Sequence, residues 1–187
     1  MFKIGIIGPE STGKTTLAQY LAKRYNGVFV PEYAREYMEN LHRPYTYEDV
    51  ETIARKQIEQ LQNLTGAAGL TAKRSNSEAV QQEQPVFFDT ELIITKVWFE
   101  HKYNKCPEWL LEALHRYPMD VYLLCYPDIA WEPDPVRENP DIRLELFNRY
   151  EAEIQALNIP YYIIRHYNTL SAARSDGNTV CRSFAYG

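Results

Sequence analysis

Residues 8–15 have the sequence Gly8-Pro9-Glu10-Ser11-Thr12-Gly13-Lys14-Thr15, and the rest of the chain is arranged around them. The stretch fits the pattern G-x-x-x-x-G-K-T, the phosphate-binding loop of proteins that bind nucleoside triphosphates. Residues 2–7 before it form an apolar run that indicates a buried strand. After it, apolar side chains recur at helical spacing, at Leu17, Leu21 and Tyr25. A strand, a glycine-rich loop and a helix are the context that this motif requires, so we expect a nucleotide-binding α/β fold.

Each residue type in this loop has a physical reason. Gly8 and Gly13 let the backbone turn tightly and approach phosphate oxygens closely. The loop amides and the N-terminus of the following helix then form an anion-binding site. We predict that Lys14 reaches the β- and γ-phosphates of ATP and that the Thr15 hydroxyl binds Mg²⁺. The alternative is a glycine turn followed by an ordinary lysine. The other loop residues that we expect at the nucleotide are Glu10, Ser11, Thr12 and Thr16, of which Thr16 can also serve only to support the start of the helix.

Length and composition indicate one domain, spanning residues 1–187. The formal net charge of -5 argues against a broad nucleic-acid-binding surface. No apolar run approaches the ~20 residues of a membrane-spanning helix, and the N-terminus lacks the apolar core of a signal peptide. The three cysteines have neither metal-ligand nor disulfide spacing. We therefore expect a soluble cytoplasmic protein whose partners include no nucleic acid and no membrane, while its oligomeric state stays open.

Glu32 follows a short strand predicted over residues 27–30. The carboxyl ends of parallel strands face the ligand crevice of an α/β sheet, so this carboxylate should lie near the γ-phosphate. A carboxylate there can orient an acceptor hydroxyl and take its proton. Arg35 lies one helical turn further on and can neutralise Glu32 or hold a substrate anion, with Tyr33 beside it. The alternative is a solvated Glu–Arg pair at the start of a helix.

Asp89 ends a second apolar strand, predicted over residues 85–88. A carboxylate at a strand end beside the phosphate loop occupies the Walker B position, so we predict that Asp89 holds Mg²⁺ directly or through water. Glu91 can share that work or contact the acceptor. The alternative is a helix cap, since Asp89 or Thr90 can cap a helix that begins near Leu92.

A charged, proline-rich segment, residues 131–140, follows a strand predicted over residues 119–126. Proline prevents a regular helix in this segment. Small P-loop kinases carry their lid at this place, and lid arginines balance the charge of the transferring phosphoryl group. We predict this role for Arg137. The alternative is a surface loop with solvated arginines.

Apolar periodicity predicts helices over residues 47–64, 91–103 and 142–157, and a last strand over residues 159–164. Residues 65–84 show little periodicity and indicate a flexible surface excursion, and an irregular tail is expected from about residue 171. Thr46 and Asp49 resemble a capping box for the first of these helices, while Trp98 is expected to be buried on the second. Candidates for the wall of an acceptor pocket, which packing explains equally well, are Tyr45, Tyr47, Arg55 and Gln57.

Four segments then occur together in one order: residues 8–15, residues 32–36, residues 88–91 and the pattern Trp131-x-x-Asp134-x-x-Arg137. With these four segments in this order, the chain resembles the ribosylnicotinamide kinase domain of the NadR family. Members of this family are P-loop kinases and are often labelled as AAA-type ATPases. The resemblance covers roughly residues 2–64 and 85–170, and it leaves no room for the family's adenylyltransferase and DNA-binding parts. It implies transfer of the ATP γ-phosphate to the 5′-hydroxyl of nicotinamide riboside, giving nicotinamide mononucleotide, with Trp131 among the substrate-binding residues. Pro31 stands where a family member has a tryptophan suited to stacking on the nicotinamide ring.

These expectations combine into one architecture and one activity. The fold should be a three-layer α/β/α sandwich around a parallel sheet of about five strands. The activity should be ATP- and Mg²⁺-dependent phosphoryl transfer to a nucleoside-like hydroxyl. The alternatives are a regulatory or interaction ATPase that hydrolyses ATP slowly, and a module that binds nucleotide without turnover.

Overall fold

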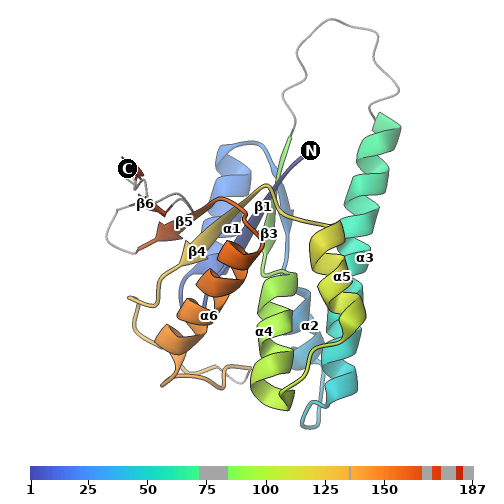
Figure 1. Ribbon diagram of the computed structural model, residues 1–187, viewed down its shortest axis with the longest axis vertical. Coiled ribbons are helices and arrows are strands. Elements are labelled where there is room, and N and C mark those ends of the chain that lie inside the picture. Colours follow the sequence, from blue (N-terminus) through green and yellow to red (C-terminus); the bar gives the residue numbers. More distant parts are fainter. Residues whose placement is uncertain (72–83, 135, 166–169, 174–179, 183–187) are drawn as a thin grey trace, which may run out of the picture.

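Five parallel strands form the centre of the computed structural model, in the spatial order β2-β3-β1-β4-β5 (Figure 1). The structure describes residues 1–71, 84–134, 136–165, 170–173 and 180–182. The parallel sheet of about five strands predicted from the sequence is confirmed. Its strands are β1 (Phe2–Ile7), β2 (Val28–Val30), β3 (Pro85–Asp89), β4 (Val121–Cys125) and β5 (Tyr161–Ile164).

Strand β1 occupies the middle of the sheet, between β3 and β4. Its residues 4–7 are buried, as expected for a strand that is covered on both faces. Gly5 is required there, because a Cβ atom at this position would lie 2.5 Å from Cε1 of Tyr122 on β4. Because β1, β2 and β3 run parallel, their carboxyl ends meet at one edge of the sheet, where the phosphate loop begins.

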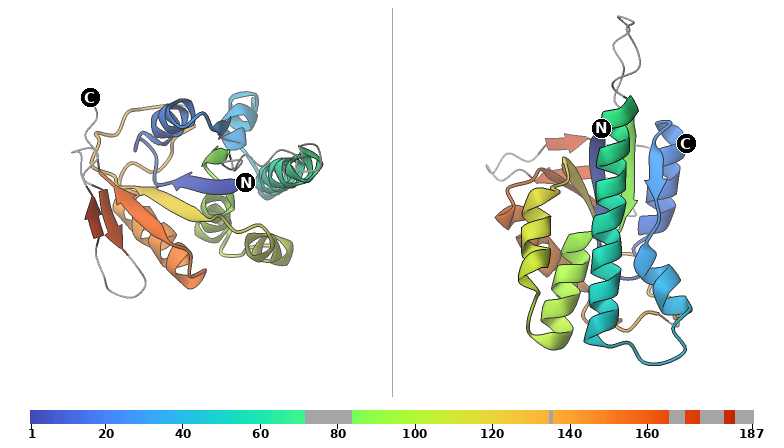
Figure 2. Two further views of the ribbon diagram at one scale, coloured as in Figure 1. Left: turned by 90° about the horizontal axis from the view of Figure 1, so that it is seen from above. Right: turned by 90° about the vertical axis from the view of Figure 1, so that its right-hand side faces the viewer.

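Helices cover both faces of the sheet, which gives the three layers expected from the sequence (Figure 2). On one face, α1 packs its alanines Ala18 and Ala22 against Ile4, Ile6 and Phe87 of the sheet. The larger core lies on the other face, beneath α3, α4, α5 and α6. The helices are α1 (Lys14–Arg24), α2 (Tyr33–Glu39), α3 (Tyr47–Thr71), α4 (Leu92–Tyr103), α5 (Glu108–Arg116) and α6 (Arg143–Ala156).

Helix α3 is longer than the sequence predicted. The expected capping box is present, because the Asp49 carboxylate accepts hydrogen bonds from the backbone N–H of Thr46 at 2.7 Å and from its hydroxyl at 3.1 Å. The helix was expected to end at Leu64 but continues to Thr71. The first seven residues of the predicted excursion, 65–71, are thus helical, and residues 72–83 lie outside the described residues.

Two short antiparallel strands follow β5, where the sequence predicted an irregular tail. Strand β6 (Leu170–Ala173) pairs with β5, and β7 (Val180–Arg182) pairs with β6. Backbone pairing gives residues 170–173 and 180–182 a strand conformation without the period-2 pattern on which the sequence prediction relied, and the rest of the predicted tail lies outside the described residues.

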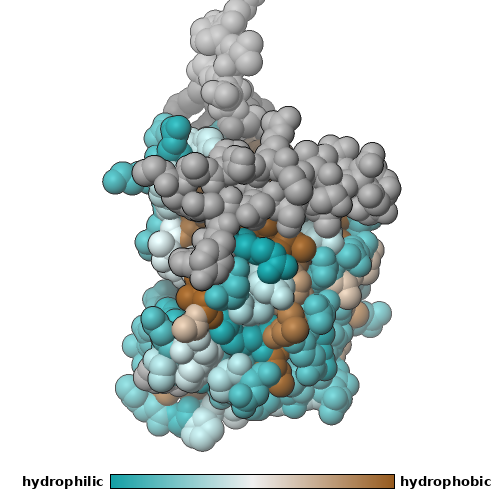
Figure 3. Space-filling model, turned by 90° about the vertical axis from the view of Figure 1, so that its left-hand side faces the viewer, coloured by the Kyte–Doolittle hydropathy of each residue, from teal (hydrophilic) through white to brown (hydrophobic). Residues whose placement is uncertain are grey.

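No helix in the described part of the chain is both long and apolar enough to cross a membrane. On the side of the molecule that carries α6 and the segment before it, the described surface is mostly hydrophilic, with apolar residues in separate patches (Figure 3).

Candidate active site

The phosphate loop joins β1 to α1 in the conformation that its glycines allow. Gly8 and Gly13 have positive φ angles of 152° and 73°. A Cβ atom on Gly8 would lie 2.6 Å from the carbonyl oxygen of Cys125, so the loop also needs glycine there for space. The Thr12 hydroxyl and the Lys14 ammonium group donate hydrogen bonds to the Pro9 carbonyl oxygen at 2.8 and 2.9 Å. The lysine side chain therefore lies across the loop whose amides it would assist in holding phosphate.

A cleft of about 280 Å³ opens from this loop along the carboxyl edge of the sheet. One wall is the loop itself, including Gly8, Glu10 to Thr16 and the start of α1. The opposite walls come from α2, α4 and α6, and from the segment before α6. Residues of those walls include Glu32, Arg35, Met38, Tyr45, Thr90, Ile94, Trp98, His101, Arg137, Glu138, Asn139 and Tyr150.

Glu32 lies in the cleft, at the end of β2 as the sequence predicted. Desolvation raises the pKa of its carboxyl, an effect that Lys14 opposes and that the nearby Asp89 reinforces. The Arg35 guanidinium is 3.9 Å away, and the Glu32 side chain is 24% exposed. The Glu32–Arg35 pair expected as an alternative is thus present, but it faces the phosphate loop rather than open solvent.

Asp89 ends β3 directly beside β1, in register with Ile6. Its side chain is buried, and one carboxylate oxygen, Oδ1, has no hydrogen-bond partner among the residues that the structure describes. Desolvation raises the pKa of this carboxyl, while a hydrogen bond with Thr15 and the charges of Lys14 and Arg35 oppose the rise. A buried carboxylate oxygen without a donor, next to the Thr15 hydroxyl, fits a cation.

Mg²⁺ is the cation that this pair suits best. Among the described residues, no group of three or more His, Cys, Asp or Glu side chains could hold a metal ion. Mg²⁺ typically takes one or two protein oxygens and completes its shell with water and substrate phosphates. One carboxylate and one hydroxyl beside a phosphate loop meet that requirement.

Glu91 is turned away from the cleft, contrary to its expected place at the metal or the acceptor. Its Oε1 accepts a hydrogen bond from the backbone N–H of Ile93 at 2.9 Å, so Glu91 caps α4, and neither Asp89 nor Thr90 does. The side chain is 3% exposed. Its contacts include Tyr122, and burial raises the pKa of Glu91 to about 7. Thr90 precedes it with φ +70°, a left-handed conformation that reverses the chain between the two acids.

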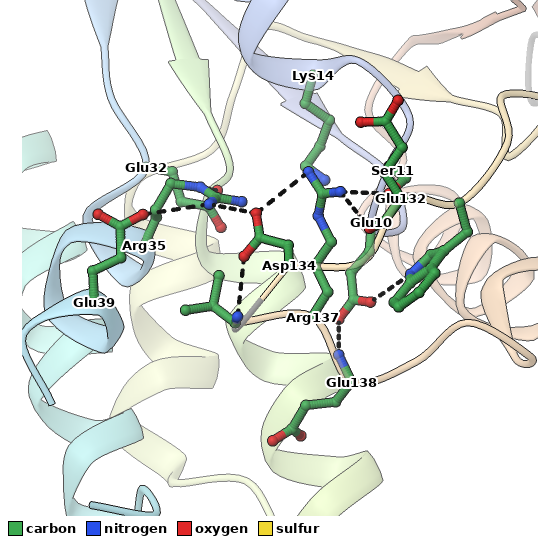
Figure 4. A network of polar contacts seen from close by, with 12 residues as sticks. Glu10, Ser11, Lys14, Glu32, Arg35, Glu39, Glu132, Asp134, Arg137 and Glu138 are labelled. Atoms are coloured by element: carbon green, nitrogen blue, oxygen red, sulfur yellow. Dashed lines mark hydrogen bonds and ion pairs between the residues drawn. The ribbon is translucent and has the colours of Figure 1, made fainter. Parts of the chain in front are cut away.

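The segment between β4 and α6 lies over the phosphate loop (Figure 4). We call its described residues, 131–134 and 136–139, the lid segment. Arg137 donates from Nη1 to the Ser11 hydroxyl at 2.9 Å and to the Glu132 carbonyl oxygen at 2.7 Å. Asp134 accepts from Arg35 of α2 at 3.0 Å. The structure thus brings the predicted lid arginine to the phosphate loop.

Two predicted substrate-binding residues, Trp131 and Tyr33, do not line the cleft. The Trp131 indole N–H instead donates to the Glu10 carboxylate at 3.4 Å. Tyr33 lies beside Tyr37, with 6.1 Å between ring centroids.

Two aromatic side chains, Tyr45 and Trp98, line the cleft, and we call this pair the aromatic wall. The sequence indicated only Tyr45 as a member of it. Tyr45 was a candidate for this wall, and its ring meets that of Trp98 edge to face, with centroids 5.1 Å apart. The Trp98 indole N–H donates to the Tyr45 hydroxyl at 3.2 Å. Trp98 was expected in the core, yet it is half-buried and lines the cleft with Ile94 and His101. The spacing 94, 98 and 101 marks one stripe of α4 and was a signal that could have indicated this wall.

Other candidates from the sequence have packing roles. Tyr47 packs on Phe99, with ring centroids 4.9 Å apart. Arg55 lies over the Trp109 ring, and Gln57 accepts a hydrogen bond from Thr95 in the core. Arg143 was not predicted at the site, but it donates hydrogen bonds to the carbonyl oxygens of Glu10, Ser11 and Ile129 at 3.0, 2.9 and 2.9 Å.

Comparison with known proteins places this geometry in a family. A family model described as an AAA domain matches residues 3–169. A NadR protein in complex with NR is similar at 25% sequence identity and a TM-score of 0.57, over 89% of this chain and 44% of that chain. A NadR protein in complex with NAD and AMP-PNP is similar at 26% identity and a TM-score of 0.55, over 88% and 43% of the two chains. This chain thus spans less than half the length of either NadR chain.

A thymidylate kinase from Ehrlichia chaffeensis shares the fold at 13% identity and a TM-score of 0.55, over 88% of this chain and 86% of that chain. The similarity to NadR and to this kinase extends over 89% and 88% of this chain. The family model extends over most of the chain, from β1 to beyond β5. The chain therefore belongs to the AAA domain family, and it has the fold of a NadR-like P-loop kinase.

Proposed function

We propose that this protein is an ATP- and Mg²⁺-dependent kinase that transfers the γ-phosphate to a hydroxyl of a nucleoside-like acceptor, with nicotinamide riboside as the first candidate. One observation carries the proposal: a single cleft contains the phosphate loop, a desolvated carboxylate and an aromatic wall. Hydrolysis of ATP alone requires only the phosphate loop, the metal and an oriented water. A kinase needs all three, because it must hold two substrates together.

The loop residues and Lys14 would hold the phosphates through backbone amides and one point charge. Thr15 and Asp89 would hold Mg²⁺, which when bound neutralises charge on the β- and γ-phosphate oxygens. Arg137 already lies against Ser11 of the loop, so its guanidinium is placed to balance the charge of the transferring phosphoryl group.

Glu32 would act on the acceptor. Its carboxylate would accept a hydrogen bond from the acceptor hydroxyl and take that proton as the oxygen attacks phosphorus. A pKa raised by desolvation makes the carboxylate a stronger base than one in water, while the charges of Lys14 and Arg35 oppose that rise in the pKa. Arg35 pairs with Glu32 and also with Asp134 of the lid segment. The pair with Asp134 would hold the guanidinium in place and so limit how far the Glu32 carboxylate turns away.

The aromatic wall would bind the planar base of the acceptor. Tyr45 and Trp98 offer ring surface in the same cleft as the loop, and stacking on a base needs no particular hydrogen-bond pattern. Pro31 is exposed and offers no aromatic ring, so Tyr45 and Trp98 would take the place of the tryptophan that a family member has at that position. The similar NadR structure in complex with NR supports nicotinamide riboside as the acceptor to test first.

A panel of ribonucleosides tests this assignment. Purified protein is incubated with Mg²⁺, ATP labelled in the γ-phosphate and one nucleoside at a time, and the phosphorylated product is separated and quantified. We expect one nucleoside, with nicotinamide riboside as the first choice, to yield labelled monophosphate at a rate well above the others. Label released as inorganic phosphate at the same rate with every nucleoside, and without any, would reject the kinase.

A further inference from the structure

Glu10 is part of the phosphate loop, but its carboxylate points out of the loop toward the lid segment (Figure 4). Oε1 accepts hydrogen bonds from the backbone N–H of Glu138 at 3.0 Å and from Nδ2 of Asn139 at 3.3 Å. Oε2 accepts from the backbone N–H of Asn139 at 3.1 Å and from the Trp131 indole at 3.4 Å. The sequence predicted that Glu10 binds the nucleotide, whereas these four contacts attach it to both ends of the lid segment.

Arg137 sits between this attachment and a second one. At the other side, Asp134 accepts from Arg35 of α2 at 3.0 Å and lies 3.7 Å from the Arg137 guanidinium. Arg137 itself reaches Ser11, the neighbour of Glu10 in the loop. The Arg137 guanidinium is thus held by Ser11, Glu132 and Asp134, and the two residues that follow it in the chain, 138–139, are held by the Glu10 carboxylate.

We propose that Glu10 is a positioning residue that holds Arg137 over the phosphate loop for contact with the terminal phosphate of the nucleotide. The proposal rests on the function proposed above. Hydrogen bonds to an ionised carboxylate are about twice as strong as those between neutral groups, which suits a connection between two loops of different elements. Arg143 holds the same stretch through the carbonyl oxygens of Glu10 and Ser11, so the loop end of the connection is fixed.

A negative charge inside a phosphate loop also has an opposing effect. The Glu10 carboxylate repels a triphosphate, so its removal alone would strengthen nucleotide binding while the loss of a positioned Arg137 would weaken it. A double-mutant cycle separates the two effects. The repulsion is the same whether or not Arg137 is present, and only the positioning effect disappears with the arginine.

The experiment compares wild type, Glu10→Ala, Arg137→Ala and the double variant by calorimetric titration with a non-hydrolysable ATP analogue and with ADP. We expect the effect of Glu10→Ala on the analogue Kd to differ about tenfold between the wild-type background and the Arg137→Ala background, a typical coupling for residues in one network. The coupling should be several-fold smaller for ADP, which lacks the γ-phosphate. Equal effects in both backgrounds, or equal coupling for ADP and the analogue, would overturn the proposal.

Two further variants keep the result interpretable. Glu10→Gln retains the size of the side chain and one acceptor oxygen, so it replaces Glu10→Ala if thermal melting shows that the alanine variant is poorly folded, and its coupling should be smaller but present. Asp141→Ala removes an exposed carboxylate two residues after Asn139 and should show no coupling to Arg137. Coupling of equal size for Asp141→Ala would reduce the Glu10 effect to general charge and refute its positioning role.

The same preparations distinguish this proposal from the proposed function. If wild type transfers phosphate to no acceptor but the coupling to the analogue is present, the kinase assignment fails and the role of Glu10 at the nucleotide stands. If transfer is observed and the coupling is absent, the kinase stands and the role of Glu10 fails.

Discussion

Replacing Glu32 with glutamine removes the proposed base and leaves the shape of the cleft intact. Glutamine keeps the size of the side chain and one hydrogen-bond acceptor, but it cannot take a proton at neutral pH. General-base catalysis contributes about 10²–10⁴-fold, so phosphorylation of the acceptor should fall by roughly that factor. The affinity for ATP should change little, because the proposal assigns the phosphates to the loop on another wall of the cleft.

The structure shows why a merely structural role predicts a much smaller effect. Glu32 and Arg35 are 3.9 Å apart, with side chains 24% and 36% exposed. Such a pair contributes no more than about 1 kcal/mol, or roughly fivefold in an equilibrium constant. Arg35 also retains its contact with Asp134 when the Glu32 charge is lost. A loss of about 100-fold or more therefore requires a chemical role.

The assay measures product formation and ATP affinity on one preparation, across a range of pH. Because the base must be ionised, the wild-type rate should rise with pH through the raised pKa of Glu32, and the glutamine variant should lack that rise. Glu36→Gln, an exposed acid on the same helix, is the matched control and should behave as wild type. A loss below about fivefold, or a parallel loss of ATP affinity, would refute the assignment of Glu32 as base.

Three other substitutions test the metal position, the aromatic wall and the buried cap of α4. Asp89→Asn should raise the Mg²⁺ concentration at half-maximal rate by about tenfold or more, because the uncharged amide is a weaker ligand; an unchanged Mg²⁺ titration would contradict a metal role. Trp98→Ala should raise the KM for the acceptor by about tenfold through lost stacking while the KM for ATP stays constant, and equal changes in both would place the acceptor elsewhere. The pKa of Glu91, raised by burial from 4.5 to about 7, means that the folded protein binds this proton more tightly than the unfolded chain. The contribution of Glu91 to the free energy of unfolding is thus fully present below about pH 4.5 and falls by ~3 kcal/mol as pH rises through about 7. Urea titrations across this pH range should show the fall in the wild type and should lack it in Glu91→Gln.

Local sequence patterns were enough to predict the centre of the site. The strand, loop and helix around residues 8–15 follow from glycine spacing and apolar runs, which act over a few residues. Glu32 and Asp89 could be placed at neighbouring strand ends, because parallel strands of an α/β sheet present their carboxyl ends at one edge.

The orientation of Glu91 could not be predicted in the same way. Asp89 and Glu91 are two residues apart, and the sequence offered both as site residues. Thr90 adopts φ +70°, which is unusual for a β-branched residue, and this turn leaves Asp89 at the sheet edge while Glu91 caps α4. Which acid lies beside Thr15 and Lys14 of the phosphate loop therefore depends on one backbone angle set by the packing around it.

Contacts over long sequence separations were equally hidden. The hydrogen bonds from the lid segment to Glu10 join residues more than 100 positions apart, and no local pattern encodes them. Trp98 is apolar and lies on a helix, so burial was the expected outcome, but α4 turns this side chain to the cleft. The extension of α3 to Thr71 includes glycines, whose low intrinsic helix propensity argued against it.

The most direct test of the account is the stoichiometry of ATP use with and without the acceptor. ADP formation and nucleoside monophosphate formation are measured together with nicotinamide riboside, and ADP formation is measured again with the acceptor left out; Lys14→Ala serves as the control for contaminating kinases. The account predicts one monophosphate for each ADP, a rate that collapses without acceptor, and a loss of about a thousandfold or more in Lys14→Ala, since the positioned charge on the phosphates is removed. ADP formation that continues unchanged without acceptor, with no monophosphate produced, would contradict it.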